Sequence, residues 1–251
     1  MKIKERRNQI VEFVNQHGSI SFAALSKEFA VSDMTLRRDL EALDNERRIV
    51  RIHGGVKSVN VVAGTDGLFS MRSACNRQAK DIIAQKALQF VRPNTTIFID
   101  SGTTTTALAA CMPDIPCLIF TSSLTCAMEF CKLKQPCVYV IGGKLNASSY
   151  SINGIRSLSF LKDVNLDVAF MGTTGFAPGR GFSCGSEEEY TLKQQIIHSA
   201  EQVIMLMDSQ KTGYAYPFSS AHVKDVDVVV SDDQLAEDVK SELERNGVRV
   251  V

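Results

Sequence analysis

Two neighbouring arginines, Arg37 and Arg38, are the first side chains in the sequence whose types and spacing suggest a chemistry. They lie in the segment VSDMTLRRDL, where Leu36, Leu40 and Leu43 recur at helical spacing and predict one buried stripe. The arginines then lie on other faces of the same helix. Because guanidinium groups bind phosphate oxygens and the edge of guanine, this helix favours contact with DNA.

The N-terminal end of this helix carries the side chains that we expect to reach the bases. Ser32 is a suitable N-cap residue. If the helix begins there, Ser32, Met34 and Thr35 lie at its N-terminal end. In helix-turn-helix proteins this end meets base edges in the major groove. Arg51 and His53 belong to a following stretch, and we expect them to contact the DNA backbone or the minor groove.

An alternative is that Arg37 and Arg38 only form a solvated helix face and pair with Asp39 and Glu41. A predicted tight turn at Ala30 and Val31, the N-cap, the leucine stripe and a predicted hairpin in residues 48–57 occur together, however, in the order of a winged helix-turn-helix. Their combination favours DNA binding over the solvated face.

Three polar turns in the rest of the chain suggest a binding site for a small anion. Each turn follows a predicted strand, and ligands of open α/β sheets bind at the carboxyl ends of the strands. Hydroxyl groups, free N–H groups at a helix start and a lysine together suit a phosphate. The residues that we expect from these turns are Asp100, Ser101, Gly102, Thr103, Thr104, Gly142, Gly143, Lys144, Asp208 and Lys211.

The elements that position the arginines are short. Helical spacing predicts three helices, in residues 4–16, 21–29 and 32–43. An alternating stretch in residues 48–57, broken by a glycine pair, predicts a β-hairpin. This order is the outline of a winged helix-turn-helix.

The elements that position the polar turns alternate between strand and helix from about residue 79, which predicts βαβ units and a mostly parallel sheet. We therefore expect an α/β protein with a winged helix-turn-helix DNA-binding domain in residues 1–57. Residues 58–75 show no period and are predicted to be a linker. An α/β domain for effector binding and oligomerisation is expected in residues 76–251.

Composition excludes several classes of protein. Residues 1–58 hold 11 Lys and Arg against 8 Asp and Glu, whereas the whole chain is neutral, with 28 of each, so the basic end suits a polyanion. No apolar run is long enough for a membrane span, and the N-terminus lacks the apolar core of a secretory signal. The seven cysteines include no C-x-x-C pair and predict reduced, mostly buried thiols of a cytoplasmic protein, without a metal site.

Residues 3–57 resemble the N-terminal domain of the DeoR family of bacterial transcription regulators. The pattern V-S-x-x-T-[IL]-R-R-D-L matches residues 31–40, and R-x-H-G-G matches residues 51–55. Arg47 departs from the family, which often has Gly before the wing.

Residues 78–251 resemble the effector domain of the same family, which is itself similar to ribose-5-phosphate isomerase. The family patterns D-[SC]-G-T-T, T-N-S and D-x-S-K-x-G are matched, with Ser122 in place of Asn and Gln210 in place of Ser. The resemblance adds Ser122, Ser123 and Lys193 to the expected effector site. It implies that a phosphorylated sugar or related metabolite binds there and alters DNA affinity.

An alternative is an active sugar-phosphate isomerase with a DNA-binding appendage. Isomerisation needs a positioned carboxylate, but Met171, Thr174 and Gly175 stand where the similar isomerases carry acids. The acidic run of residues 187–189 is the remaining source of carboxylates, although acids are also favoured at a helix N-terminus. We therefore expect no catalytic residues, no cofactor and no enzyme activity.

The sequence thus predicts a cytoplasmic transcription regulator, a repressor of a carbohydrate-metabolism operon that a phosphorylated sugar releases from operator DNA. One small helix-turn-helix rarely suffices alone, so we expect a homodimer or homotetramer and no membrane partner. A constitutive DNA binder whose α/β domain only oligomerises is a further alternative.

Overall fold

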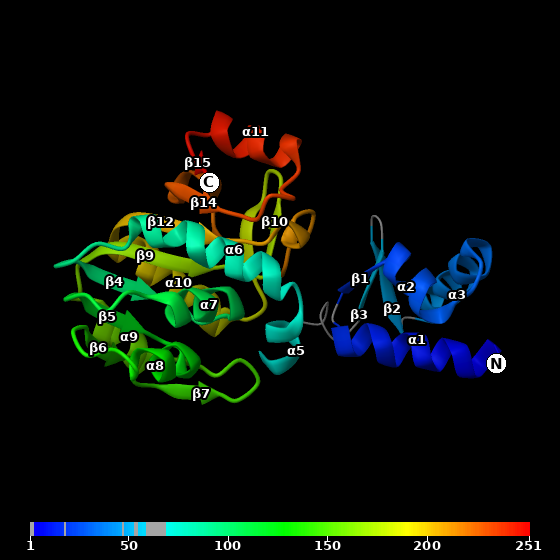
Figure 1. The fold of residues 1–251 in the computed structure, drawn as a ribbon, viewed down its shortest axis with the longest axis horizontal. Helices are drawn as coiled ribbons and strands as arrows, with labels where there is room; N and C mark the ends of the chain where they lie inside the picture. The colour runs from blue at the N-terminus through cyan, green and yellow to red at the C-terminus, as the bar shows by residue number, and fades with distance from the viewer. Residues whose placement is uncertain (1–2, 18, 47, 53–54, 59–68) are drawn as a thin grey trace. The chain divides into compact units, whose positions relative to one another are not determined.

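The structure is a computed structural model that describes residues 3–17, 19–46, 48–52, 55–58 and 69–251. The chain divides into two compact units, Met1–Cys75 and Asn76–Val251 (Figure 1). Among the described residues no helix is both long and apolar enough to cross a membrane.

The first unit contains short helices around a three-stranded antiparallel sheet in the order β1-β3-β2. Its elements are α1 (Ile3–His17), β1 (Ser19–Ser21), α2 (Phe22–Phe29), α3 (Asp33–Asn45), β2 (Ile49–Ile52), β3 (Gly55–Ser58) and α5 (Phe69–Ala74). The three predicted helices and the hairpin are present. The predicted linker interval contains helix α5, which the sequence pattern missed because six residues are too few to show a helical period.

Local interactions explain where these helices begin and end. The Ser21 hydroxyl accepts a hydrogen bond from Ala24 N at the start of α2, and Ala30 ends that helix in a left-handed conformation. Leu36, Leu40 and Leu43 of α3 are buried together with residues of α1 and α2, as the leucine stripe predicts. The stripe therefore fixes which faces of α3 remain outside.

Strand β1 was not predicted, because three residues are too few to show a period. It exists through its pairing with β3, in which Ser21 lies opposite Gly55. A side chain at Gly55 would collide with the carbonyl oxygen of Ile20, so the close approach of the two strands requires glycine.

The second unit is built on a seven-stranded sheet in the order β15-β14-β12-β9-β4-β5-β6, in which all paired strands run parallel. The strands are β4 (Thr96–Ile99), β5 (Leu118–Thr121), β6 (Cys137–Val140), β9 (Leu166–Gly172), β12 (Ala200–Leu206), β14 (Val228–Val230) and β15 (Arg249–Val250). The predicted α/β fold with a mostly parallel sheet is confirmed.

Helices cover both faces of this sheet (Figure 1). They are α6 (Arg77–Ala87), α7 (Thr103–Cys111), α8 (Leu124–Phe130), α9 (Ile155–Leu161), α10 (Glu187–Ser199) and α11 (Glu237–Arg245). Successive strand residues point to opposite faces, so Phe98 packs in the core with α9, α10 and α11, whereas Ile97 and Ile99 pack with α6, α7 and α8.

Short antiparallel elements add to the parallel sheet and were missed by the sequence pattern. They are the hairpin β7 (Lys144–Asn146) and β8 (Ser151–Asn153) and the sheet of β10 (Gly175–Ala177), β11 (Gly181–Cys184) and β13 (Phe218–Ala221). None exceeds four residues, too short for an alternation to stand out. The prediction of mostly buried cysteines is wrong, since only Cys117, Cys126 and Cys184 are buried.

Candidate functional site

The outward face of α3 is exposed and carries the arginine pair. Met34 is 66% exposed, and Ser32, Arg37 and Arg38 are also exposed. The guanidinium of Arg37 lies 4.8 Å from the centroid of the Phe22 ring, which orients it. Arg38 has no hydrogen bond or ion pair to any described residue. Its guanidinium is therefore available to a phosphate or a base.

The alternative pairing of these arginines with Asp39 is wrong. Asp39 lies on the buried stripe, where Arg6 Nε of α1 donates to its Oδ2 at 2.7 Å and Arg7 Nε donates to its Oδ1 at 2.9 Å. The charge of Asp39 is thus neutralised inside the unit. Exposed Glu41 forms no ion pair with any described residue. Neither Asp39 nor Glu41 therefore neutralises the positive charges of Arg37 and Arg38.

Internal hydrogen bonds fix the two ends of the candidate DNA surface. Ser32 caps α3, because its Oγ accepts from Thr35 N, and the hydroxyls of Ser32 and Thr35 lie 2.9 Å apart. Arg51 is exposed, and its backbone N donates to Asp44 Oδ1 at 3.2 Å, which ties β2 to α3. His53 lies outside the described residues.

In the second unit, Asp100 follows β4 and is buried against α10. Its Oδ2 accepts hydrogen bonds from Gly172 N at 3.0 Å and from Lys193 Nζ. Lys193 also donates to Gly172 O at 2.7 Å and lies 3.4 Å from Glu189 Oε1. Asp100 and Lys193 are each 2% exposed, so they form a buried link among β4, β9 and α10.

Burial alone would lower the pKa of Lys193, but the negative charges of Asp100 and Glu189 outweigh it and hold that pKa above its ordinary value. The ammonium is therefore charged and its donors face acceptors of the protein. The acidic run at the start of α10 does not gather into a catalytic pair: Glu187 and Glu188 are exposed, whereas Glu189 faces Lys193.

Two hydroxyls at the carboxyl ends of β4 and β5 are buried without a hydrogen-bond partner among the described residues. They are Thr104 Oγ1, in the first turn of α7, and Ser122 Oγ, directly after β5. Gly102, at the N-cap of α7, has no side chain to accept from the first turn. Buried polar groups are nearly always paired, so these two hydroxyls are exceptions to that rule.

The remaining residues of these turns surround the same sheet edge. Ser101, Gly102 and Thr103 are partly exposed at the start of α7. Ser123 is buried, and its Oγ caps α8 by accepting from Cys126 N at 3.2 Å. The hydroxyl of Ser123 is therefore already used inside the protein.

The glycine turn after β6 connects to the Ser122 loop through the β7–β8 hairpin. Ile152 N of β8 donates to Ser122 O at 2.7 Å, and Ser157 Oγ donates to Gly142 O at 2.8 Å. A side chain on Gly143 would collide with Asn153 O, so glycine permits this approach. Lys144 is exposed.

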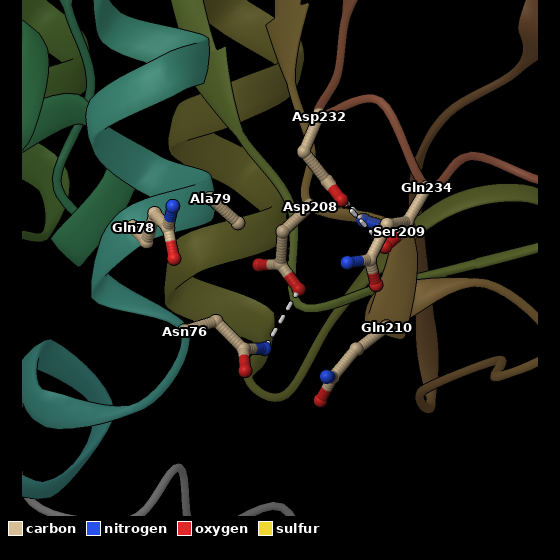
Figure 2. Close-up of a pocket in the computed structure, with 8 residues that line it drawn as sticks. All are labelled: Asn76, Gln78, Ala79, Asp208, Ser209, Gln210, Asp232 and Gln234. Atoms are coloured by element: carbon tan, nitrogen blue, oxygen red, sulfur yellow. Dashed lines mark hydrogen bonds between the residues drawn. The ribbon is translucent and has the colours of Figure 1, made fainter.

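The third turn contributes Asp208 and Lys211. Asp208 follows β12 and is buried, and its Oδ1 accepts from Asn76 Nδ2 at 3.2 Å (Figure 2). Its Oδ2 lies 3.5 Å from Lys211 Nζ. Asp232, which follows β14, lines one pocket together with Asp208. Asp232 was not expected from the sequence, although it lies two residues after a parallel strand and a polar residue behind a strand is the signal that identified Asp100.

Within the part of the chain that the structure describes, no three His, Cys, Asp or Glu side chains are arranged as metal ligands.

Comparison with protein families matches the model of the DeoR-like helix-turn-helix domain to residues 6–62 and that of the DeoR C terminal sensor domain to residues 75–233.

Curated relatives cover nearly the whole chain. The uncharacterized HTH-type transcriptional regulator YulB of Bacillus subtilis is 32% identical over 100% of this chain and 96% of its own length. The glycerol-3-phosphate regulon repressor of Escherichia coli is 30% identical over 92% of each.

Among solved structures, ribose 5-phosphate isomerase A from Methanocaldococcus jannaschii matches 55% of each chain, with a TM-score of 0.41 and 15% identity, a likeness too distant to carry a functional argument. The family matches and the full-length relatives decide between regulator and enzyme. The chain belongs to the DeoR family of transcriptional regulators and is a DNA-binding regulator rather than an enzyme.

Proposed function

We propose that the chain represses a carbohydrate-metabolism operon, that residues 1–57 bind the operator, and that a phosphorylated sugar or related metabolite bound by residues 76–251 releases it. The name of the Escherichia coli relative, a repressor of a glycerol-3-phosphate regulon, supports this class of target and effector. As a regulator of transcription the protein acts in the cytoplasm, as a homodimer or homotetramer on repeated half-sites.

The observation that carries the DNA-binding half is the separation of charge on α3. Asp39 is neutralised inside by Arg6 and Arg7, whereas Arg37 and Arg38 face outward. A cationic helix face binds phosphates with release of counterions, so operator affinity falls steeply with salt. Met34 and Thr35 lie nearer the helix start, and we propose that they meet base edges.

The effector half is supported by the two unpartnered hydroxyls, Thr104 Oγ1 and Ser122 Oγ. They lie beside the uncapped first turn of α7, whose backbone N–H groups favour an anion. A phosphate oxygen accepts from both kinds of donor. The effector releases the operator only to the extent that it binds the DNA-incompetent arrangement more tightly than the competent one.

A gel shift at fixed salt tests the proposal, using DNA that flanks the protein's own gene and a panel of sugar phosphates. We expect specific retardation that one compound relieves. Arg38→Ala should weaken operator binding by about 1–3 kcal/mol, that is, about 5- to 150-fold, without altering the circular dichroism spectrum. An Arg38→Ala variant with unchanged operator affinity contradicts the DNA-binding assignment, and specific retardation that no sugar phosphate relieves contradicts the effector assignment.

A further inference from the structure

An open cavity of about 160 Å³ lies at the carboxyl ends of β12 and β14, beside the start of α6 (Figure 2). This volume is below that of sites that enclose a whole drug-sized ligand, about 300–1,000 Å³, so the cavity has room for only part of a ligand. The lining is polar throughout except for Ala79. It consists of Asn76, Gln78, Ala79, Asp208, Ser209, Gln210, Asp232 and Gln234.

The two carboxylates of the cavity are already engaged. Both oxygens of Asp232 accept hydrogen bonds from Ser209, one from its backbone N at 2.6 Å and one from its hydroxyl at 2.8 Å. Asp208 accepts from Asn76 and lies near Lys211. Two buried acids with one neighbouring lysine make the cavity unfavourable for a phosphate.

The glutamine amides of the cavity, in contrast, are free. Gln78, Gln210 and Gln234 are exposed, and their side chains have no hydrogen bond to any described residue. Each amide offers two donors and an acceptor, and a carboxylate offers acceptors. A sugar hydroxyl both donates and accepts, so an uncharged polyhydroxyl group satisfies this lining, whereas an apolar ligand or a second phosphate does not.

We propose that this cavity binds the uncharged, hydroxyl-bearing part of the effector, with Gln210 and Gln234 as its principal new contacts. The inference rests on the proposed function, because it divides one ligand between a phosphate end and a sugar end. Gln210 is also a position at which this chain departs from the family pattern, which has Ser there. The longer amide then determines which sugar is accepted.

The cavity is built on the residue at which the second unit begins. Asn76 is the first residue of that unit, has a positive φ of 49°, and donates its side-chain hydrogen bond to Asp208, 132 residues away. A sugar hydroxyl that reaches Asp208 must share or replace this bond. Occupancy of the cavity therefore acts on the residue that follows the last residue of the first unit, and this gives the ligand a route to operator affinity.

Isothermal titration of the full chain tests the site, with D-glucose 6-phosphate, D-fructose 6-phosphate, D-ribose 5-phosphate, glycerol 3-phosphate and inorganic phosphate as probes. For the sugar phosphate that binds the wild type, we expect Gln210→Ala with Gln234→Ala to weaken affinity at least tenfold. Affinity for inorganic phosphate should stay the same. The matched control is Gln85→Ala, an exposed glutamine of α6 outside the cavity.

The outcomes separate this inference from the proposed function. If a sugar phosphate binds the wild type and the double glutamine variant equally well, the cavity assignment is overturned while the proposed effector class stands. If no sugar phosphate binds the wild type, both fail. Asn76→Ala tests whether the occupied cavity changes operator affinity through Asn76. At a saturating concentration of the sugar phosphate, this variant should no longer release the operator. Full release in this variant overturns the role of Asn76.

Discussion

Asp39 in the first unit and Asp100 in the second are both 2% exposed carboxylates, but their surroundings differ. Asp39 is met by two arginines that are 13% and 26% exposed, and each of its carboxylate oxygens accepts a hydrogen bond from one of them. Asp100 is met by a fully enclosed lysine, at an edge of the sheet where two hydroxyls have no partner among the described residues.

The difference shows where each unit carries its function. In the first unit, internal pairing neutralises Asp39 and leaves Arg37 and Arg38 on the surface, so the candidate DNA interface consists of exposed groups. In the second unit, the candidate effector site consists of buried groups whose hydrogen bonding is incomplete. Substitutions on the exposed surface of α3 should leave the core intact, whereas substitution of the buried pair Asp100 and Lys193 should destabilise it.

The largest effect is expected from Lys193→Met, which leaves Asp100 buried and without its cation. The loss of unfolding free energy should be about 3–5 kcal/mol, because an uncompensated buried charge remains. Urea unfolding followed by circular dichroism measures it in the second unit. Adding Asp100→Asn to this variant should recover part of the loss, and an unchanged midpoint in the single variant contradicts the buried link.

Asp39→Ala should cost less, about 1–3 kcal/mol, because its arginine partners are partly exposed and regain water. The loss should appear in the unfolding of the first unit. Hydrogen exchange of α1 and α3 amides measures it, with Glu41→Ala as the exposed control on the same helix. A larger loss than that of Lys193→Met would reverse the comparison of the two units.

A smaller effect on stability is expected where the buried hydroxyls are removed. Thr104→Val and Ser122→Ala each delete a hydroxyl without a described partner, so unfolding free energy should change by no more than about 0.5 kcal/mol or increase. Thermal unfolding without added ligand measures it. Ser123→Ala is the matched control and should lower stability by about 1 kcal/mol, because that hydroxyl caps α8; equal losses in all three would show that the hydroxyls are paired.

The smallest effect concerns Cys126, whose Sγ lies 3.8 Å from Asp100 O. Burial raises the pKa of this thiol to about 11, and alkylation requires the thiolate, so Cys126 should stay unlabelled by iodoacetamide at pH 8. The exposed Cys131 and Cys137 should react. Mass spectrometry of the native protein distinguishes them, and labelling of Cys126 as fast as Cys131 would mean that this interior opens readily.

Hydrophobic periodicity in the sequence predicted the longer helices and strands. It did not predict the contacts between segments that lie far apart in the chain. The stripe of Leu36, Leu40 and Leu43 predicted the inner face of α3, and position 39 lies on the same stripe, so the burial of Asp39 could have been inferred. The pairing of Lys193 with Asp100 could not, because 93 residues separate them and only the sheet order brings them together.

Strand length and burial limited the rest. The hairpin of β7 and β8 and the strand β1 have three residues each, so tertiary pairing rather than sequence pattern defines them. The polar turns predicted which residues end the strands. Which hydroxyls lack partners depends on the packing of neighbouring loops, such as Ile152 N on Ser122 O, and no spacing in the sequence reports that.

The most direct test of a regulator with an exposed DNA surface and a buried effector site is an operator gel shift on the Thr104→Val, Ser122→Ala double variant. It should bind operator DNA with wild-type affinity but no longer be released by the sugar phosphate that releases the wild type. Wild-type release in this variant would contradict the assignment of the buried hydroxyls to the effector site.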